Sequence, residues 1–195
     1  MSLFQSITII ISAATDAATT SHTTRTPCGP TNGPPPSQST DDDPGQPIYF
    51  YDSDKPYYEF TSFSDHPVEY HGRSYRTAEH LFQALKFMNT NPALAERIRM
   101  LPTARMAQQE AKKQIRHQRV DWLEVNVAMM EKVLEVKFKQ HRHLRNLLRS
   151  TGSRELIEDS PIDWFWGIGS DGHGRNELGK ALIRLRERLQ AGRRH

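Results

Sequence analysis

The chain has 195 residues, of which 36% are hydrophobic and 25% charged, and its formal net charge is +3. This length indicates one domain, or one domain with a tail, and supplies enough apolar residues for a core. Cys28 is the only cysteine, which excludes an intramolecular disulfide and a cysteine metal site and makes a reducing compartment the default expectation.

The first 47 residues differ in composition from the rest. From Ser12 to Pro47 the chain is rich in Thr, Ser, Pro, Gly and Asp, so we expect residues 1–47 to be a disordered tail and order to begin at Ile48. The apolar start has no basic residue before Arg25 and is too short to span a membrane. We therefore expect an intracellular protein, cytoplasmic or nuclear.

Charge divides at the same boundary. The tail contributes one basic and four acidic residues to totals of 26 and 23, which leaves residues 48–195 with a net charge of +6. Part of this excess lies in a basic C-terminal end, residues 191–195. A positive domain suits a phosphate-bearing or nucleic-acid partner.

After the tail, short strand patterns are followed by amphipathic helix patterns. The β-forming residues of 48–51 and the alternation of 68–75 around Gly72 predict a strand and a small hairpin, and Leu156–Glu158 predicts another short strand. Helical periodicity and capping residues predict helices at 77–88, 91–98, 103–115, 121–138, a segment around Leu144 that closes near Gly152, and 176–189. The fold class is therefore α+β, a mainly helical compact single domain with a small β-sheet or hairpin.

The predicted helix from Thr77 to Met88 has two faces. Glu79, Gln83 and Lys86 follow i, i+4 and i+7 spacing and share the polar one. A carboxylate, an amide and an amine aligned over two turns can form a catalytic face. On the pattern alone they can equally be the solvated side of an amphipathic helix.

The second informative stretch runs from Asp163 to Asn176. Three aromatic residues precede four glycines, and a helix start follows. Glycines let the backbone approach a ligand, and aromatic faces beside them can stack on a nucleobase. The alternative is a glycine-rich surface loop that its tryptophans pin to the core. Glu79 and Asp163 are the natural candidates for a pair of glycosidase carboxylates.

Together the two stretches resemble the YbiA-like, or NADAR, family over residues 48–190. The resemblance rests on E-H-x-F-Q-A-x-K-F from Glu79, on W-G-x-G from Trp166 and on N-x-L-G from Asn176, with F-x-S-F at 60–63 in support. It implies a compact, mainly helical α+β domain of the YbiA-like fold without metal or organic cofactor. It also implies an N-glycosidase whose substrate is a phosphoribosyl intermediate of riboflavin synthesis or an ADP-ribosylated guanine in nucleic acid.

The resemblance also suggests roles for individual residues. Glu79 is the expected acid/base, and Lys86, if desolvated, is a Schiff-base nucleophile. The expected substrate-binding residues are Ser62, Phe63, Gln83, Asp163, Trp166, Gly167, Gly169 and Asn176. Two positions depart from the family pattern, because Ser62 stands where Asn is usual and Tyr58 where Gly is frequent. Both lie in the loop before the hairpin and bear on substrate choice.

Two other classes of function stay open at this point. A non-catalytic module that binds ADP-ribose or a related nucleotide would use the aromatic–glycine loop without turnover. A basic nucleic-acid binder would use the positive charge of the domain, and its affinity would fall steeply with salt.

Overall fold

The computed structural model describes residues 45–192. The predicted tail, including Cys28, lies almost entirely outside the described residues, as do residues 193–195 of the basic C-terminal end. Between residues 45 and 192 the elements are, in order, β1 (Ile48–Phe50), η1 (Tyr58–Phe60), β2 (Val68–Tyr70), β3 (Arg73–Tyr75), α1 (Ala78–Leu85), α2 (Pro92–Arg99), α3 (Ala104–Lys113), η2 (Ile115–His117), α4 (Trp122–Gln140), α5 (Arg142–Ser150), β4 (Leu156–Glu158) and α6 (Glu177–Ala191). The α+β class, mainly helical with a small sheet, is confirmed.

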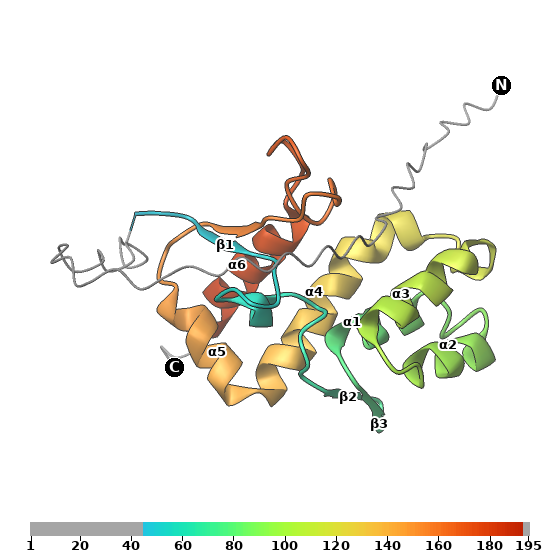
Figure 1. Ribbon diagram of the computed structural model, residues 1–195. Helices are drawn as coiled ribbons and strands as arrows, with labels where there is room; N and C mark the ends of the chain where they lie inside the picture. The colour runs from blue at the N-terminus through green and yellow to red at the C-terminus, as the bar shows by residue number, and fades with distance from the viewer. Residues whose placement is uncertain (1–44, 193–195) are drawn as a thin grey trace, which may run out of the picture. The chain divides into compact units, whose positions relative to one another are not determined.

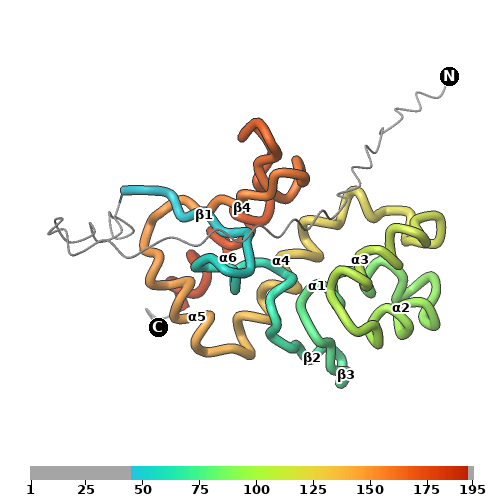
Figure 2. Tube along the Cα trace, viewed as in Figure 1, coloured from blue at the N-terminus to red at the C-terminus, as the bar shows by residue number. Residues whose placement is uncertain are grey.

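The strands form two separate pairs. β1 and β4 are parallel, with Ile48 opposite Leu156 and Phe50 opposite Glu158, and the two segments run side by side in Figure 2. β2 and β3 form the predicted hairpin, whose turn residues His71 and Gly72 both have positive φ, 48° and 72°. This backbone suits a tight two-residue hairpin turn.

The long helix α4 is the centre of the domain. It contacts α1 on one side and α5 and α6 on the other, and α2 and α3 pack on α1, as Figure 1 shows. The core is one cluster of apolar side chains that includes Phe60, Leu81, Leu134 and Phe138. No helix within residues 45–192 is long and apolar enough to cross a bilayer.

Three predicted helix starts are confirmed by their capping bonds. Thr77, Asn91 and Thr103 each accept a hydrogen bond from a backbone N–H in the first turn of α1, α2 and α3, which satisfies a donor that a helix start leaves free. Asp121, the first residue of the predicted helix 121–138, is an exception. The Asp121 carboxylate pairs with Arg119 instead, at 2.6 Å and 2.7 Å, and makes no capping bond.

A lysine in α4 fixes the loop that precedes the hairpin. Lys137 is fully buried, and its Nζ donates to the carbonyl oxygens of Glu59 and Thr61 and to Ser64 Oγ at 2.6, 2.8 and 2.6 Å. Three oxygen acceptors match the three donors of an ammonium group. Lys137 therefore ties residues 59–64 to the centre of the domain.

Candidate functional site

Helix α1 is buried along its whole length, from Ala78 to Leu85. The polar side chains of its predicted catalytic face are buried with it, since Glu79 is 3% exposed and Gln83 4% exposed. The solvated face that the pattern left open is therefore excluded for these two residues. A buried carboxylate needs hydrogen-bond partners, and the surrounding loop supplies them.

Both carboxylate oxygens of Glu79 accept a hydrogen bond. Ser62 Oγ donates to Oε2 and Gln83 Nε2 donates to Oε1, each at 2.6 Å, and the Glu79 backbone N–H donates to the Ser62 carbonyl at 2.9 Å. Burial raises the pKa of Glu79, whereas these two hydrogen bonds and the charge of Lys86 act in the opposite direction. Ser62 thus supports the carboxylate directly from the loop that Lys137 anchors.

Lys86 follows the last turn of α1, and its ammonium group lies beside two aromatic rings that also contact each other. Nζ is 5.6 Å from the ring centroid of Phe82 and 5.3 Å from that of Trp122, which is cation–π range. Burial lowers the pKa of Lys86, and the charge of Glu79 counteracts this effect. Lys86 is half-buried, and the lowered pKa is the direction that a lysine nucleophile requires. Trp166 packs edge-on against Phe82, with centroids 5.5 Å apart.

Asp163 organises the turn that carries the tryptophans. Its Oδ1 accepts the backbone N–H groups of Phe165 and Trp166 at 2.9 Å and 2.7 Å, and its own N–H donates to Ser160 Oγ at 3.2 Å. Its negative charge also contributes to raising the pKa of Glu79, after the larger effect of burial. The predicted carboxylate pair, Glu79 and Asp163, is therefore close enough to interact electrostatically.

The glycine-rich loop packs against β4. The amide of Asn176 donates to the Leu156 carbonyl at 2.8 Å and accepts from the Glu158 N–H at 3.0 Å. A Cβ on Gly167 would lie 2.6 Å from the Glu158 carbonyl oxygen, and one on Gly169 would meet the Trp164 ring at 2.6 Å. The structure thus gives Asn176, Gly167 and Gly169 packing contacts within the domain, and their contacts with substrate stay a prediction.

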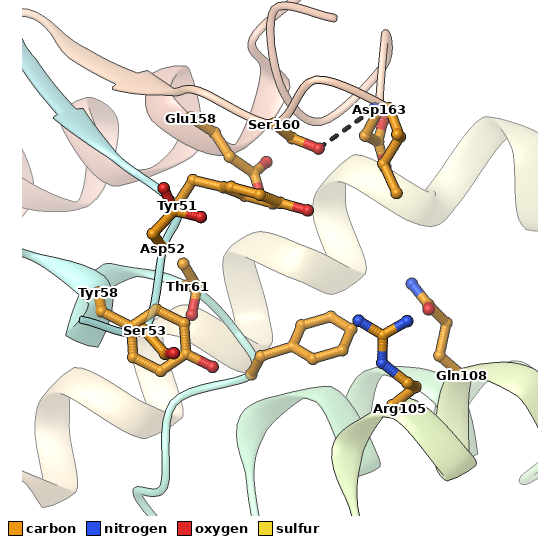
Figure 3. A pocket seen from close by; sticks show the side chains of 12 residues that line it. Tyr51, Asp52, Ser53, Tyr58, Thr61, Arg105, Gln108, Glu158, Ser160 and Asp163 are labelled. Atoms are coloured by element: carbon orange, nitrogen blue, oxygen red, sulfur yellow. Dashed lines mark hydrogen bonds between the residues drawn. The ribbon is translucent and has the colours of Figure 1, made fainter. Parts of the chain in front are cut away.

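A cleft of about 330 Å³ opens between this loop, the segment after β1 and helix α3. Its lining residues, most of them labelled in Figure 3, are Tyr51, Asp52, Ser53, Tyr58, Thr61, Phe63, Arg105, Gln108, Glu158, Ser160, Ile162 and Asp163. Of the predicted site residues, Phe63 and Asp163 line the cleft. Ser62 lies between two lining residues and donates its hydroxyl to Glu79. Gln83, Lys86 and Trp166 are not among the lining residues.

The two sides of the cleft differ in charge. Glu158, Ser160 and Asp163 lie on one side, and Arg105 and Gln108 reach in from α3 on the other (Figure 3). Within residues 45–192, no hydrogen bond or ion pair occupies the Arg105 guanidinium. Sequence reasoning missed Arg105 and Glu158. A carboxylate at the end of a predicted strand was a usable signal for Glu158, whereas Arg105 had none among the many basic residues.

The sequence of the chain is similar to those of known proteins. The NADAR domain model matches residues 49–190. The N-glycosidase YbiA of Escherichia coli is 36% identical over 142 residues, which cover 73% of this chain and 88% of that protein. An N-glycosidase of Nostoc punctiforme is 35% identical over 144 residues, 73% of this chain and 92% of that protein.

A solved structure extends the comparison to the fold. The NMR structure of Escherichia coli YbiA superposes with a TM-score of 0.70 at 34% sequence identity, covering 76% of this chain and 87% of that one. A riboflavin biosynthesis protein of Vibrio vulnificus is 38% identical over 145 residues, but these cover only 39% of its length. The match of the domain model over most of the described residues, together with these relatives, shows that the chain belongs to the NADAR family.

Proposed function

We propose that the protein hydrolyses the N-glycosidic bond of a nucleotide-like substrate, either an ADP-ribosylated guanine or a phosphoribosyl adduct of a base. The observation that carries the proposal is a buried carboxylate, Glu79, within electrostatic range of a half-buried amine of lowered pKa, Lys86, on the same helix. The two relatives named N-glycosidase support the reaction class. ADP-ribosylated guanine as substrate rests on the family resemblance and on the chemistry of the cleft.

The carboxylate suits the charge that develops during the reaction. Breaking the bond between ribose C1′ and a base nitrogen leaves positive charge on the sugar ring, which a nearby carboxylate stabilises. Glu79 also has the position of an acid/base, because Ser62 and Gln83 hold both of its oxygens. A buried group with a raised pKa exchanges protons near neutral pH more readily than an exposed carboxylate.

Lys86 supplies a nucleophile in its neutral form. Its Nζ lone pair forms a bond to C1′ while the electron pair of the C1′–N bond leaves with the base, which takes up one proton. Ring opening then gives an imine between Lys86 and the sugar, and water hydrolyses it to free sugar and free amine. The net reaction adds water across the N-glycosidic bond. Burial lowers the pKa of the Lys86 amine, which favours this form.

The opposite side of the cleft suits the phosphate end of the substrate. The Arg105 guanidinium is exposed in the cleft and free to form paired hydrogen bonds to phosphate oxygens. The aromatic side chains of Tyr51, Tyr58 and Phe63 line the space between Arg105 and the acidic side, where a base can stack. The ribose joins the phosphate to the base, so a phosphate on Arg105 would direct the ribose, and the base that it carries, toward Glu158 and Asp163.

A second candidate is a non-catalytic module that binds ADP-ribose or a related nucleotide. The observation that favours it is the lining of the cleft, which includes Arg105 and three aromatic residues but neither Glu79 nor Lys86. This candidate predicts saturable calorimetric binding with no release of base. A substrate attached to nucleic acid would add a salt dependence to either candidate.

The test is a single-turnover assay with an ADP-ribosylated guanine oligonucleotide and, separately, a ribosylaminopyrimidine 5′-phosphate as substrate. We expect release of free base from one of them, and borohydride should trap the sugar on the peptide that contains Lys86. Lys86→Met should abolish trapping, because Met fills the space beside the rings without an amine. Lys112→Met, an exposed control on α3, should retain it. If the wild-type protein binds but releases base from neither substrate, the hydrolase proposal is wrong and the binding module replaces it.

A further inference from the structure

Glu158 is held rigidly at the point where β4 reaches the cleft. Its backbone N–H donates to Asn176 Oδ1 at 3.0 Å, and its carbonyl accepts from the Ile168 N–H at 3.0 Å. Its β-strand partner is Phe50. The backbone is thus fixed on both edges, and the side chain lines the cleft beside Tyr51 and Ser160 (Figure 3).

The carboxyl group of Glu158 has none of the support that Glu79 has. Its Oε2 is buried and has no hydrogen-bond partner within residues 45–192, whereas both oxygens of Glu79 accept a hydrogen bond. An ionised carboxylate without donors is costly to bury, and the neutral acid is the favoured form. The titratable groups that face Glu158 are Asp163 and Glu79, and Asp52, Tyr51, Tyr58 and Arg105 line the same cleft.

We propose, resting on the N-glycosidase function above, that Glu158 is the general acid that protonates the leaving base. A neutral carboxylic acid in the cleft has an O–H to donate. As the C1′–N bond breaks, its electron pair goes to the base nitrogen and the Glu158 proton goes to the base. Glu158 is left as a carboxylate, and it regains a proton from the water that completes hydrolysis.

This assignment divides the acid and base work between two glutamates with different surroundings. Glu79 accepts hydrogen bonds from Ser62 and Gln83 on both oxygens, which support its ionised form as the carboxylate that stabilises the sugar cation, although burial raises its pKa as well. Glu158, without donors and beside two other carboxyl groups, keeps its proton. Two carboxyl groups with different hydrogen-bond partners can take complementary roles in glycoside cleavage.

The protonation state of Glu158 also sets the pH range in which we expect activity. Burial, and after it the charges of Asp163 and Glu79, raise the pKa of Glu158 to about 8. The acid form therefore predominates at neutral pH and is lost as the pH rises through 8. Activity that needs this proton should fall on the alkaline side with an apparent pKa near 8.

The experiment compares wild type, Glu158→Gln and Asp159→Asn from pH 6 to 10 on the two substrates of the preceding section. Asp159 is the neighbouring exposed carboxylate and serves as the matched control. We expect Glu158→Gln to lower kcat at pH 7 by about 10²- to 10⁴-fold, the usual range for a lost general acid. The remaining rate should no longer fall above pH 8. Asp159→Asn should keep both the rate and the alkaline fall.

The pH profile separates a catalytic role from a structural one. A structural defect in Glu158→Gln would lower the rate at every pH and leave the alkaline fall in place, which would overturn the inference. A rate within about threefold of wild type at pH 7 would overturn it as well, while leaving the N-glycosidase function intact. If the wild-type protein cleaves neither substrate, the proposed N-glycosidase function is wrong, and the role of Glu158 as general acid is wrong with it.

Discussion

Replacing Lys137 by Met should destabilise the domain and loosen the loop that supports Glu79. Met keeps the apolar stem of the side chain but removes the group that donates to Glu59, Thr61 and Ser64. Ser64 Oγ also lies 3.3 Å and 3.2 Å from the Glu59 and Thr61 carbonyl oxygens and can donate to one of them. Each buried acceptor that is left without a partner costs about 1–3 kcal/mol. Met also avoids the cost of burying an ammonium group, which offsets part of this loss of stability. We therefore expect the free energy of unfolding to fall by about 2–4 kcal/mol.

Urea denaturation at pH 7 measures this loss, with Lys139→Met as the control. Lys139 lies two residues away on α4, its side chain is 64% exposed, and it pairs with Glu135 on the surface. Such a pair contributes less than about 1 kcal/mol. A loss of under about 1 kcal/mol in Lys137→Met, or a loss equal to that of Lys139→Met, would refute the anchoring role.

The difference in unfolding free energy between wild type and Lys137→Met should also depend on pH. Burial lowers the pKa of Lys137 from 10.5 to about 7, so between these values the unfolded chain binds a proton that the folded chain does not. The contribution of Lys137 to stability is therefore fully present above pH 10.5 and is lost as the pH falls through 7. The difference in unfolding free energy between wild type and Lys137→Met should widen from pH 7 to 10. A difference that narrows over this range would contradict the argument.

Three further predictions concern the site and its support. Ser62→Ala removes a donor to Glu79 and should raise the pKa of that carboxyl further, which a shift of the acid limb of the pH–rate profile to higher pH would show. Gly179→Ala should lower the unfolding free energy by at least about 2 kcal/mol in urea denaturation, although alanine favours helices, because its Cβ would overlap the Leu156 carbonyl oxygen. Glu158→Gln should be more stable than wild type at pH 9 and close to it at pH 4. The raised pKa of Glu158 makes its contribution fully present below pH 4.5 and lost as the pH rises through 8, and thermal unfolding at the two pH values tests this.

The parts of the fold that depend on local chemistry could be predicted from the sequence. Thr77, Asn91 and Thr103 cap helices because the bond joins residues three apart in the chain, and Gly72 marks its turn for the same reason. Asp121 shows the limit of this reasoning. A nearby arginine offers its carboxylate a bidentate partner, and that pair replaces the capping bond.

The site was only partly predictable, because burial and long-range neighbours decide it. The helical spacing of Glu79, Gln83 and Lys86 is visible in the sequence, whereas burial on both faces of α1 arises from helices α2, α3 and α4 that pack around it. Glu158 and Arg105 line opposite sides of one cleft, although they are more than fifty residues apart in the sequence. The glycine-rich loop was expected at the ligand, but its close approach is to the backbone of β4.

The parallel pairing of β1 with β4 joins the first described strand to one that follows more than a hundred residues later. Closing so long a loop is an entropic barrier to folding, which slows chains dominated by distant contacts. During synthesis, Ile48–Phe50 can pair only after its partner strand β4 has left the ribosome. Asn176, which bonds to the backbone of β4, is synthesised later still. A ribosome-stalled chain that ends before Asn176 would thus lack the side chain that bonds to the backbone of β4 on both sides of Ile157.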